Sequence, residues 1–471
     1  MASLPSYPSL FEINTRVWLD RLSREAGRPV TLATVDDATL DGLARLGFDW
    51  VWLLGVWRTS AASCAVSRTN LAWRSEFQAA VPDLTAEDIC GSYFAIAAYE
   101  VDEALGGKTA LADFRARLAT RGLRLMLDFV PNHTGLDHPW VTTHPDFYVT
   151  EHGTHVLAHG RDPNFPGWPD TLQLNYANPG LQAAQRTELL SIAAQCDGLR
   201  CDMAMLLLPD VFHRTWGLTP GPFWPTAIAA VRQKHPGFTF LAEAYWDLEW
   251  ELQQQGFDYC YDKRLYDRLR SGDAGAVRAH LAAGLDYQDR LARFLENHDE
   301  PRAAASFPWP QHQAAAIVTY FAPGLRFFHQ GQFDGARVRV PVHLRRGPVE
   351  PRDPDIAAFY DRLLTVLFRD SAWSLIAPQP AWPGNPSWQD FISCAWRAPD
   401  GGRYVVVVNY SDHQAQCRLR LPFTGLVGGR FRLVDRMGSE VYDRDGDELI
   451  DPGLYIDLGA WRYNVFKLEP I

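Results

Sequence analysis

The sequence predicts an α/β fold: a (β/α)8 TIM barrel with a short subdomain inserted after the third strand and a C-terminal all-β sandwich domain. Two observations support this prediction. Short apolar runs bounded by turn residues alternate with amphipathic stretches of helical spacing through roughly the first 370 residues, a pattern typical of βα units around a parallel sheet. After about residue 370 the chain changes to β-type runs separated by turns, which is typical of a separate all-β domain.

Eight apolar runs are the candidate barrel strands, and that number favours a closed barrel over an open sheet. They are residues 11–19, 49–55, 123–128, 198–202, 238–243, 257–260, 291–295 and 325–329. Helical periodicity lies between them at residues 109–120, 181–194, 223–233 and 354–368. In the C-terminal part, the clearest strand patterns are residues 404–410, 417–421, 430–434 and 461–468.

One long irregular segment interrupts the alternation. Residues 134–180, which follow the third predicted strand, are rich in His, Pro, Asp and Trp. Loops of this length in compact domains are usually functional or form small subdomains, so we expect a lid-like subdomain over the barrel mouth. The predicted domains are a barrel of residues 1–133 and 181–370, the insertion 134–180, and a β-sandwich of residues 371–471.

Composition and charge exclude several classes of protein. A chain of 471 residues with 47% hydrophobic and 21% charged residues is typical of a folded protein with a sizeable core. The 45 Lys and Arg against 56 Asp and Glu give a net charge of −11 without a basic run, so nucleic acid is not an expected partner. The seven scattered cysteines never form a Cys-x-x-Cys pair, which indicates reduced thiols and disfavours zinc.

The sequence also gives an expectation for location. It contains no run of eighteen apolar residues and no basic-then-apolar leader, so we expect no membrane association and a cytoplasmic protein. The oligomeric state is left open. The 17 Trp, 17 Tyr and 25 Phe form an aromatic load that is common where flat sugar rings are stacked, although core packing also uses such residues.

Polar side chains follow the third predicted strand. Asp128, Asn132 and His133 place an acid, an amide and an imidazole at the exit of an apolar run, a cluster suited to hydroxyl groups or a cation. The active sites of TIM barrels are built at this C-terminal rim. The competing interpretation is a turn in which Asp128 and Asn132 only cap the backbone.

The fourth predicted strand carries a pair of opposite charges. Its period of two places Arg200 and Asp202 on the same side of the strand. A guanidinium beside a carboxylate lowers the pKa of the carboxylate and keeps it ionised, as a nucleophilic carboxylate requires. A purely structural ion pair is the alternative.

The fifth and seventh predicted strands each lead to an acid. Glu243 closes an apolar run beside aromatic residues, so we expect desolvation to raise its pKa, as a general acid needs; a solvated helix cap is the alternative. His298 and Asp299 could hold neighbouring hydroxyls of one sugar ring, and the pKa of Asp299 should rise because two other acids are close. Glycoside hydrolysis with retention uses such a pair of carboxylates, with the ionised one as nucleophile and the protonated one as acid.

Four segments resemble the signature motifs of the α-amylase family of glycoside hydrolases and transglycosidases. They are residues 128–133, 198–202, 242–243 and 297–299, in the family's order and with family-like spacing. The resemblance covers nearly the whole chain, since the family also has a subdomain after the third barrel strand and an all-β C-terminal domain. It implies that Asp202 is the nucleophile, that Glu243 is the acid that then serves as base, and that Asp299 binds and distorts the cleaved sugar.

The resemblance also implies binding roles for the residues around these acids. The predicted substrate-binding residues are Asp128, His133, Arg200, His298 and Phe94. The two histidines would bond sugar hydroxyls, and Arg200 would also orient the nucleophile. Phe94, in the segment 91–96, would be the aromatic platform under the same sugar.

Departures from the family pattern concern metal and substrate. Ala98 and Gln332 stand where acids are common, and residues 173–175 only partly match the motif that closes the inserted subdomain. In many members the asparagine matching Asn132 ligates calcium. Because the insertion is short, we expect no required cofactor, with Asn132 as a ligand only where Ca²⁺ binds.

We therefore expect an enzyme, a retaining hydrolase acting on α-glucosidic bonds of short oligosaccharides or disaccharides through a covalent glycosyl-enzyme intermediate. The motifs leave open a transglycosylase, because the two activities differ only in which acceptor resolves the intermediate. A non-catalytic sugar-binding relative would lack the nucleophile or the acid, and both are present. A metal-dependent barrel hydrolase would need histidines in its first strand, and residues 11–19 contain none.

Overall fold

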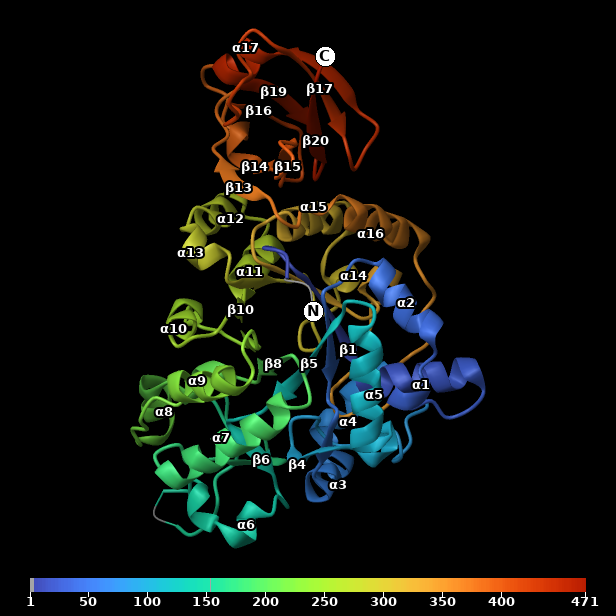
Figure 1. Cartoon of the computed structure of the whole chain (residues 1–471), viewed down its shortest axis with the longest axis vertical. Coiled ribbons are helices and arrows are strands. Elements are labelled where there is room, and N and C mark those ends of the chain that lie inside the picture. The colour runs from blue at the N-terminus through green and yellow to red at the C-terminus, as the bar shows by residue number, and fades with distance from the viewer. Residues whose placement is uncertain (1–3, 153) are drawn as a thin grey trace.

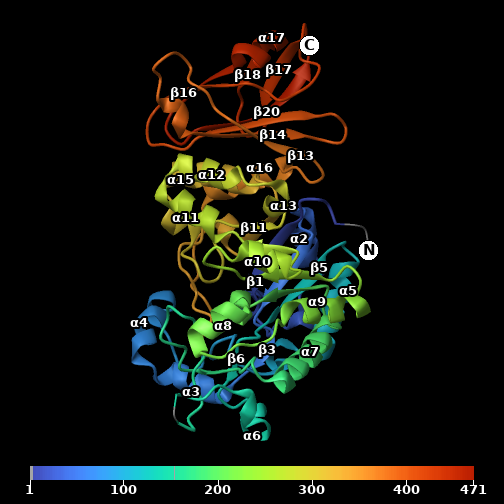
Figure 2. The ribbon, with the colours of Figure 1, turned by 90° about the vertical axis from the view of Figure 1, so that its left-hand side faces the viewer.

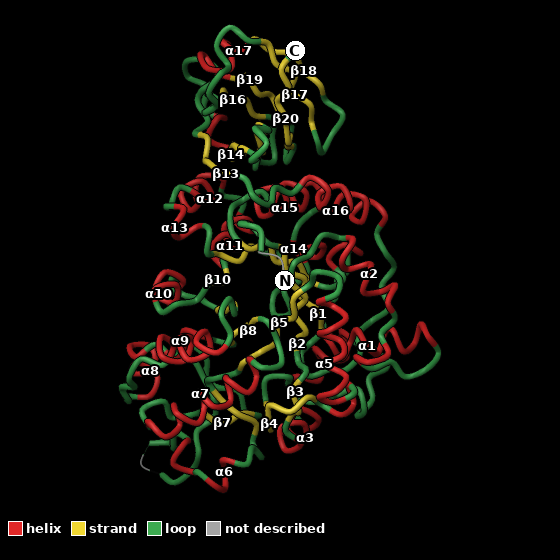
Figure 3. Tube along the Cα trace, in the orientation of Figure 1, coloured by secondary structure: helices red, strands yellow, loops and turns green. Residues whose placement is uncertain are grey.

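A closed barrel of parallel strands forms the centre of the molecule. The computed structural model describes residues 4–152 and 154–471. Around the barrel the strands follow the order β1-β12-β11-β10-β9-β8-β5-β2, and β1 pairs with both β12 and β2 to close it. Figure 3 shows helices surrounding these strands. The predicted (β/α)8 barrel is confirmed.

The barrel elements lie close to the predicted ranges. The strands are β1 (Ser9–Asn14), β2 (Trp50–Leu54), β5 (Arg124–Phe129), β8 (Gly198–Cys201), β9 (Thr239–Ala242), β10 (Tyr259–Tyr261), β11 (Leu291–Arg293) and β12 (Leu325–His329). The helices around and between them are α1 (Thr15–Ala26), α2 (Asp37–Arg45), α5 (Gly107–Ala119), α7 (Pro179–Ala193), α8 (Pro209–Trp216), α9 (Trp224–Lys234), α10 (Glu249–Gln254), α11 (Lys263–Ser271), α12 (Ala274–Leu281), α13 (Leu285–Gln288), α14 (Ala303–Ser306), α15 (Trp309–Tyr320) and α16 (Pro354–Val366).

The first strand ends earlier than the sequence predicted. β1 stops at Asn14, whose side chain accepts a hydrogen bond from the Val17 N–H at 3.3 Å and so caps helix α1. Trp18 and Leu19 then lie buried on the inner face of that helix. The predicted strand over residues 11–19 is therefore wrong beyond Asn14, because the capping asparagine starts a helix inside the apolar run.

Two excursions leave the barrel on the side where the strands end. The sequence predicted the one after β5, which contains β6 (His133–Gly135), α6 (Trp140–Thr143) and β7 (Thr171–Gln173). It did not predict the one after β2, which contains β3 (Trp57–Thr59), α3 (Ala61–Thr69), α4 (Leu71–Ala80) and β4 (Ile96–Val101). In Figure 1 helices α3 and α6 lie at the end of the molecule opposite the C-terminal strands.

The C-terminal part is all-β, as predicted. A six-stranded sheet has the order β13-β14-β15-β20-β17-β18, and β16 and β19 form a second sheet. The strands are β13 (Ala372–Ile376), β14 (Phe391–Arg397), β15 (Arg403–Asn409), β16 (Ala415–Leu419), β17 (Arg430–Asp435), β18 (Val441–Asp445), β19 (Leu454–Leu458) and β20 (Tyr463–Pro470). Both sheets contribute to one buried cluster, for example through Val405 and Ile456, so the two layers pack face to face.

One face of the six-stranded sheet rests on the barrel helices. Figure 2 shows the β layers stacked beyond α12, α15 and α16. Trp396 of β14 is fully buried at this junction, and its Nε1–H donates to the Phe321 carbonyl at 3.0 Å. The Tyr410 hydroxyl donates to the Leu269 carbonyl at 2.7 Å. Within residues 4–152 and 154–471, no helix is both long and apolar enough to cross a bilayer.

Trp396→Ala should destabilise the protein by about 3–5 kcal/mol, because it removes a fully buried indole and leaves the Phe321 carbonyl without its donor. Chemical denaturation followed by tryptophan fluorescence and circular dichroism measures the loss. Trp382→Ala is the matched control, since that indole is 50% exposed. Equal effects of the two substitutions would show that the junction does not stabilise the fold.

Candidate active site

Residues that follow different barrel strands line one cavity of about 420 Å³. Asp202 follows β8, Glu243 follows β9, and Asp299 lies on the loop after β11. Phe94, from the excursion after β2, and His133, the first residue of β6, complete the same lining. The structure therefore brings together the three predicted carboxylates and two of the predicted binding residues.

Arg200 connects two of the carboxylates. Its Nη1 lies 2.7 Å from Asp202 Oδ1, and its Nη2 lies 2.6 Å from Glu243 Oε2. The guanidinium is fully buried, and the rings of Trp52, Phe94 and Tyr261 lie 5.4, 5.2 and 5.8 Å from it. The sequence predicted the contact with Asp202 only, because the contact with Glu243 crosses from one strand to the next.

The two carboxylates bonded to Arg200 are both almost fully buried. Burial raises the pKa of Asp202 above its usual range, although Arg200 opposes the shift. The prediction that this pKa is lowered is therefore wrong, because desolvation outweighs the effect of the guanidinium. Burial likewise raises the pKa of Glu243, to about 7, against the pull of Arg200. That shift has the direction expected from the apolar strand preceding it.

Two further groups hold Glu243. The Met203 N–H donates to its Oε2 at 2.7 Å, and the Tyr245 hydroxyl donates to its Oε1 at 2.8 Å. Tyr245 also lines the cavity. This role of Tyr245 was not predicted, although the alternation of side chains along the strand, extended beyond Glu243, would have placed Tyr245 on the same side as Glu243.

Asp299 is held by an imidazole that is itself held from behind. His298 Nε2 lies 2.9 Å from Asp299 Oδ2, and His298 Nδ1 lies 2.5 Å from Glu12 Oε1. Desolvation alone would raise the pKa of Asp299, but His298 and Arg200 outweigh it and hold the pKa at about 2. The predicted rise is therefore wrong. Desolvation also disfavours the charged form of His298, yet the two carboxylates raise its pKa well above the usual range.

Glu12 was missed in the sequence analysis. It lies in β1, is fully buried, and raises the pKa of His298 together with Asp299, whose effect is the larger. The available signal was a single acid inside an otherwise apolar first strand. A charged side chain is rarely buried in a barrel strand unless another charge pairs with it.

Asp128 supports the site from below. Trp52 Nε1–H donates to its Oδ1 at 3.0 Å, and the Gly55 N–H donates to its Oδ2 at 2.8 Å. Burial raises the pKa of this carboxyl to about 7. Because both oxygens already accept hydrogen bonds from the protein, the geometry gives Asp128 a supporting position.

The predicted binding residues around the acids form a partly aromatic lining. His133 is buried, burial lowers its pKa to about 4, and its ring centre lies 5.4 Å from that of Trp168. Phe94 lies 5.5 Å from the His298 ring. A neutral imidazole can both donate to and accept from a sugar hydroxyl, and aromatic faces pack on sugar rings.

A strap of residues 336–346, from the loop after β12, closes one side of the cavity. Cys90 and Tyr93 donate their N–H groups to the carbonyls of His343 at 2.9 Å and Val342 at 3.2 Å. Arg346 binds Asp83 at 3.0 Å and Asp88 at 2.6 Å. The excursion after β2 therefore fixes the strap. The sequence signal was the length of chain between the second and third strands, which exceeds one βα connection.

The residues around Asn132 do not fit a calcium ion. Gln173 Nε2 lies 3.0 Å from Asn132 Oδ1, 3.0 Å from the Asn132 carbonyl and 3.1 Å from the Leu174 carbonyl. Three oxygens thus converge on an amide nitrogen, whereas Ca²⁺ takes six to eight oxygen ligands, many from carboxylates. Among the described residues, no group of three His, Cys, Asp or Glu side chains is placed to hold a metal.

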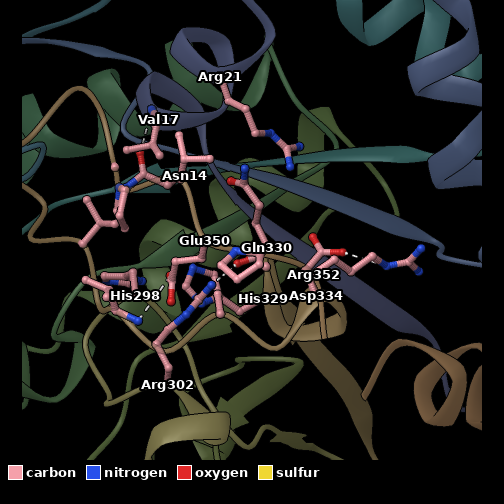
Figure 4. Close-up of a pocket in the computed structure, with 18 of the residues that line it drawn as sticks. Asn14, Val17, Arg21, His298, Arg302, His329, Gln330, Asp334, Glu350 and Arg352 are labelled. Carbon is pink, nitrogen blue, oxygen red and sulfur yellow. Dashed lines mark hydrogen bonds and ion pairs between the residues drawn. The ribbon is translucent and has the colours of Figure 1, made fainter. Parts of the chain in front are cut away.

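A second cavity of about 550 Å³ is lined by His298. Figure 4 shows His298 and Arg302 toward the left of this lining and Asp334 with Arg352 toward the right. Its charges are largely paired within the protein: Arg302 lies 2.7 Å from Glu296, and Arg352 lies 3.4 Å from Asp334. The two carboxylates that share Arg200 line the first cavity, and His298 lines the second cavity.

A family model described as alpha amylase, catalytic domain, matches residues 36–207, which include β5, β8, Arg200 and Asp202. This part of the chain matches the α-amylase family. Solved structures show the same fold over almost the whole chain. A maltogenic alpha-amylase from Thermotoga neapolitana superposes with a TM-score of 0.71, 18% identity and 98% coverage of both chains. An alpha-amylase from Lactobacillus plantarum superposes with a TM-score of 0.70 and 20% identity, covering 98% of this chain and 99% of its own.

The curated relatives of this chain include proteins named alpha-amylase and maltosyltransferase. Alpha-amylase MalA of Haloarcula japonica is 24% identical over 64% of this chain and 41% of its own length. An alpha-1,4-glucan:maltose-1-phosphate maltosyltransferase of Bifidobacterium longum is 28% identical over 51% of this chain and 32% of its own. The chain spans about half the length, or less, of the curated relatives it matches.

A chelator should leave the melting temperature of the protein unchanged, because Gln173 already bonds the oxygens around Asn132. Gln173→Ala should destabilise it by roughly 1–3 kcal/mol, since buried acceptors lose their donor. Differential scanning calorimetry with and without EDTA measures both. Gln195→Ala, just beyond the C-terminal end of α7, is the control, because its side chain makes an exposed hydrogen bond to the Ser191 carbonyl. A chelator-induced loss of stability that Ca²⁺ restores would contradict this account.

Proposed function

We propose that this chain is a retaining glycosidase that cleaves α-glucosidic bonds of short oligosaccharides or disaccharides through a covalent glycosyl-enzyme intermediate. One observation carries the proposal: a single buried guanidinium contacts both Asp202 and Glu243 in a cavity that Asp299 also lines. Sharing one arginine favours the close carboxyl spacing of retaining enzymes, about 5–5.5 Å, over the about 6.5–9.5 Å of inverting ones.

The shared arginine also gives the two acids different protonation states. One positive charge stabilises one carboxylate, so the second acid of the buried pair retains its proton at neutral pH. With a pKa of about 7, Glu243 is the acid that can deliver a proton there. Asp202, bonded to Nη1, is the nucleophile.

In the first step, Asp202 attacks the anomeric carbon while Glu243 protonates the leaving oxygen, and the glycosidic bond breaks as the ester to Asp202 forms. In the second step, Glu243 removes a proton from water, which attacks the anomeric carbon and releases Asp202. Asp299 has a pKa of about 2 and is therefore ionised at neutral pH. It accepts hydrogen bonds from ring hydroxyls of the substrate, with the cationic His298 beside it. No cofactor is needed to balance these steps.

The size and lining of the cavity support short neutral substrates. Its volume of about 420 Å³ lies toward the small end of the ~300–1,000 Å³ typical of small-molecule sites. Phe94, His133 and Trp168 give it faces on which sugar rings can pack. A cytoplasmic location is part of this proposal; all seven cysteines are free, as is usual in reducing compartments.

Transglycosylation is the second candidate. The similarity to a protein named as a maltosyltransferase supports it. In that case a sugar hydroxyl replaces water in the second step, and the residues keep the same roles. A purely sugar-binding protein would have no need of an acid whose pKa is raised to about 7 beside a second carboxylate.

Proton NMR of the first product tests the mechanism. With maltose, maltotriose, isomaltose, trehalose, sucrose and an aryl α-glucoside as substrates, the first anomeric signal should be that of the α product. Asp202→Asn should reduce kcat by roughly 10³-fold or more, because no other group can form the ester. Asp412→Asn, on the surface of the β domain, is the control. A β product would refute retention, and the product size separates hydrolysis from transfer.

The pH dependence of kcat/KM should show a fall above about pH 7, as Glu243 loses the proton it must donate. Tyr245→Phe should move this fall to higher pH by roughly one unit, since it removes a hydrogen bond that favours the ionised carboxylate. Stopped assays over pH 5–10 measure both profiles. An alkaline limb that does not move in Tyr245→Phe would show that another group controls it.

A further inference from the structure

A buried carboxylate outside the catalytic trio faces the same cavity. Asp170, just before β7, lines the cavity and is only 2% exposed. Among the described residues its Oδ2 has no hydrogen-bond partner. An unsatisfied buried carboxylate oxygen is costly to the fold, so its persistence points to a ligand that supplies the missing donor.

His343, from the strap, lies beside this oxygen. Its Nε2 lies 3.6 Å from Asp170 Oδ2, too far for a good hydrogen bond. A hydroxyl that donates its proton to Asp170 and accepts from Nε2–H would satisfy both groups. The His343 ring is held in place by Trp73 at 4.7 Å and Phe77 at 5.4 Å.

The charges that act on His133 indicate where this pair lies relative to the catalytic acids. Both Asp170 and Glu243 favour the protonated form of His133, so His133 lies within range of the two. On the strap, Arg339 forms an ion pair with Glu76 of α4, and both line the cavity. The lining around Asp170 therefore includes side chains from the insertion, the strap and α4.

We propose that Asp170 and His343 form a hydroxyl-recognition site that selects one neutral sugar hydroxyl away from the reacting bond. This inference rests on the proposed function and names a specificity determinant of the same site. A sugar hydroxyl satisfies Asp170 Oδ2, whereas an anionic substituent at that position meets a buried negative charge. A substrate without that hydroxyl leaves the carboxylate unpaired and should be rejected.

Asp170→Asn tests the proposal with a panel of monodeoxy analogues of the preferred disaccharide. In the wild-type protein one analogue should show a far lower kcat/KM than the others. Asp170→Asn should lower kcat/KM for the parent sugar by about 10- to 100-fold, mainly through KM. It should have little effect on that one analogue, because the contact is already absent. His343→Asn should show the same pattern, and Glu151→Gln, exposed on the insertion, should match the wild type.

Stability separates recognition from a structural role. Asp170→Asn removes an unsatisfied buried charge, so its melting temperature should equal or exceed that of the wild type while activity falls. A lower melting temperature with a uniform loss on every analogue would overturn the proposal, as would unchanged kinetics. If the wild-type protein turns over none of the sugars, the proposed function fails and this inference falls with it. If the wild type is active and Asp170→Asn is unaffected, only the inference fails.

Discussion

The site depends on one buried guanidinium. Arg200 has no access to solvent, and its charge is compensated by two carboxylates from neighbouring strands and by three aromatic rings. Removing an arginine from water in this way is unfavourable unless its partners are fixed. The barrel supplies that rigidity, because β8 and β9 are paired along their whole length. Geometry and charge at Asp202 and Glu243 are therefore set by the same side chain.

A second layer of the structure determines the shape of the cavity. The excursion after β2 and the strap after β12 are far apart in sequence, yet backbone hydrogen bonds and the Arg346 ion pairs join them. The apolar cluster of Phe77, Ile89 and Leu344 packs between them. Catalytic groups thus come from the barrel, whereas much of the contact surface for substrate comes from loops that hold one another. Such loops can change specificity while leaving the acid pair in place.

Sequence reasoning worked where the signal was local. Strand ends carrying Asp128, Asp202 and Glu243 were evident because a polar residue terminates an apolar run. Prediction from the sequence failed where the deciding contact joins segments that lie far apart in the sequence. Glu12 in another strand adds to the effect of Asp299 on the pKa of His298, and the pKa of Asp202 follows from burial that no local pattern reveals. The helix beginning at Thr15 was missed because its cap, Asn14, lies inside the segment 11–19 that was predicted to be one strand.

The contact between Glu12 and His298 links the chemistry to completion of the chain. Glu12 belongs to the first strand, His298 follows β11, and β12 lies between those strands in the barrel. His298 receives this second, buried carboxylate only when the last strand has joined the first. In an unfinished barrel Asp299 would be the only one of the two carboxylates beside that imidazole. Closure of the barrel therefore strengthens the cation that holds Asp299 in the substrate cavity.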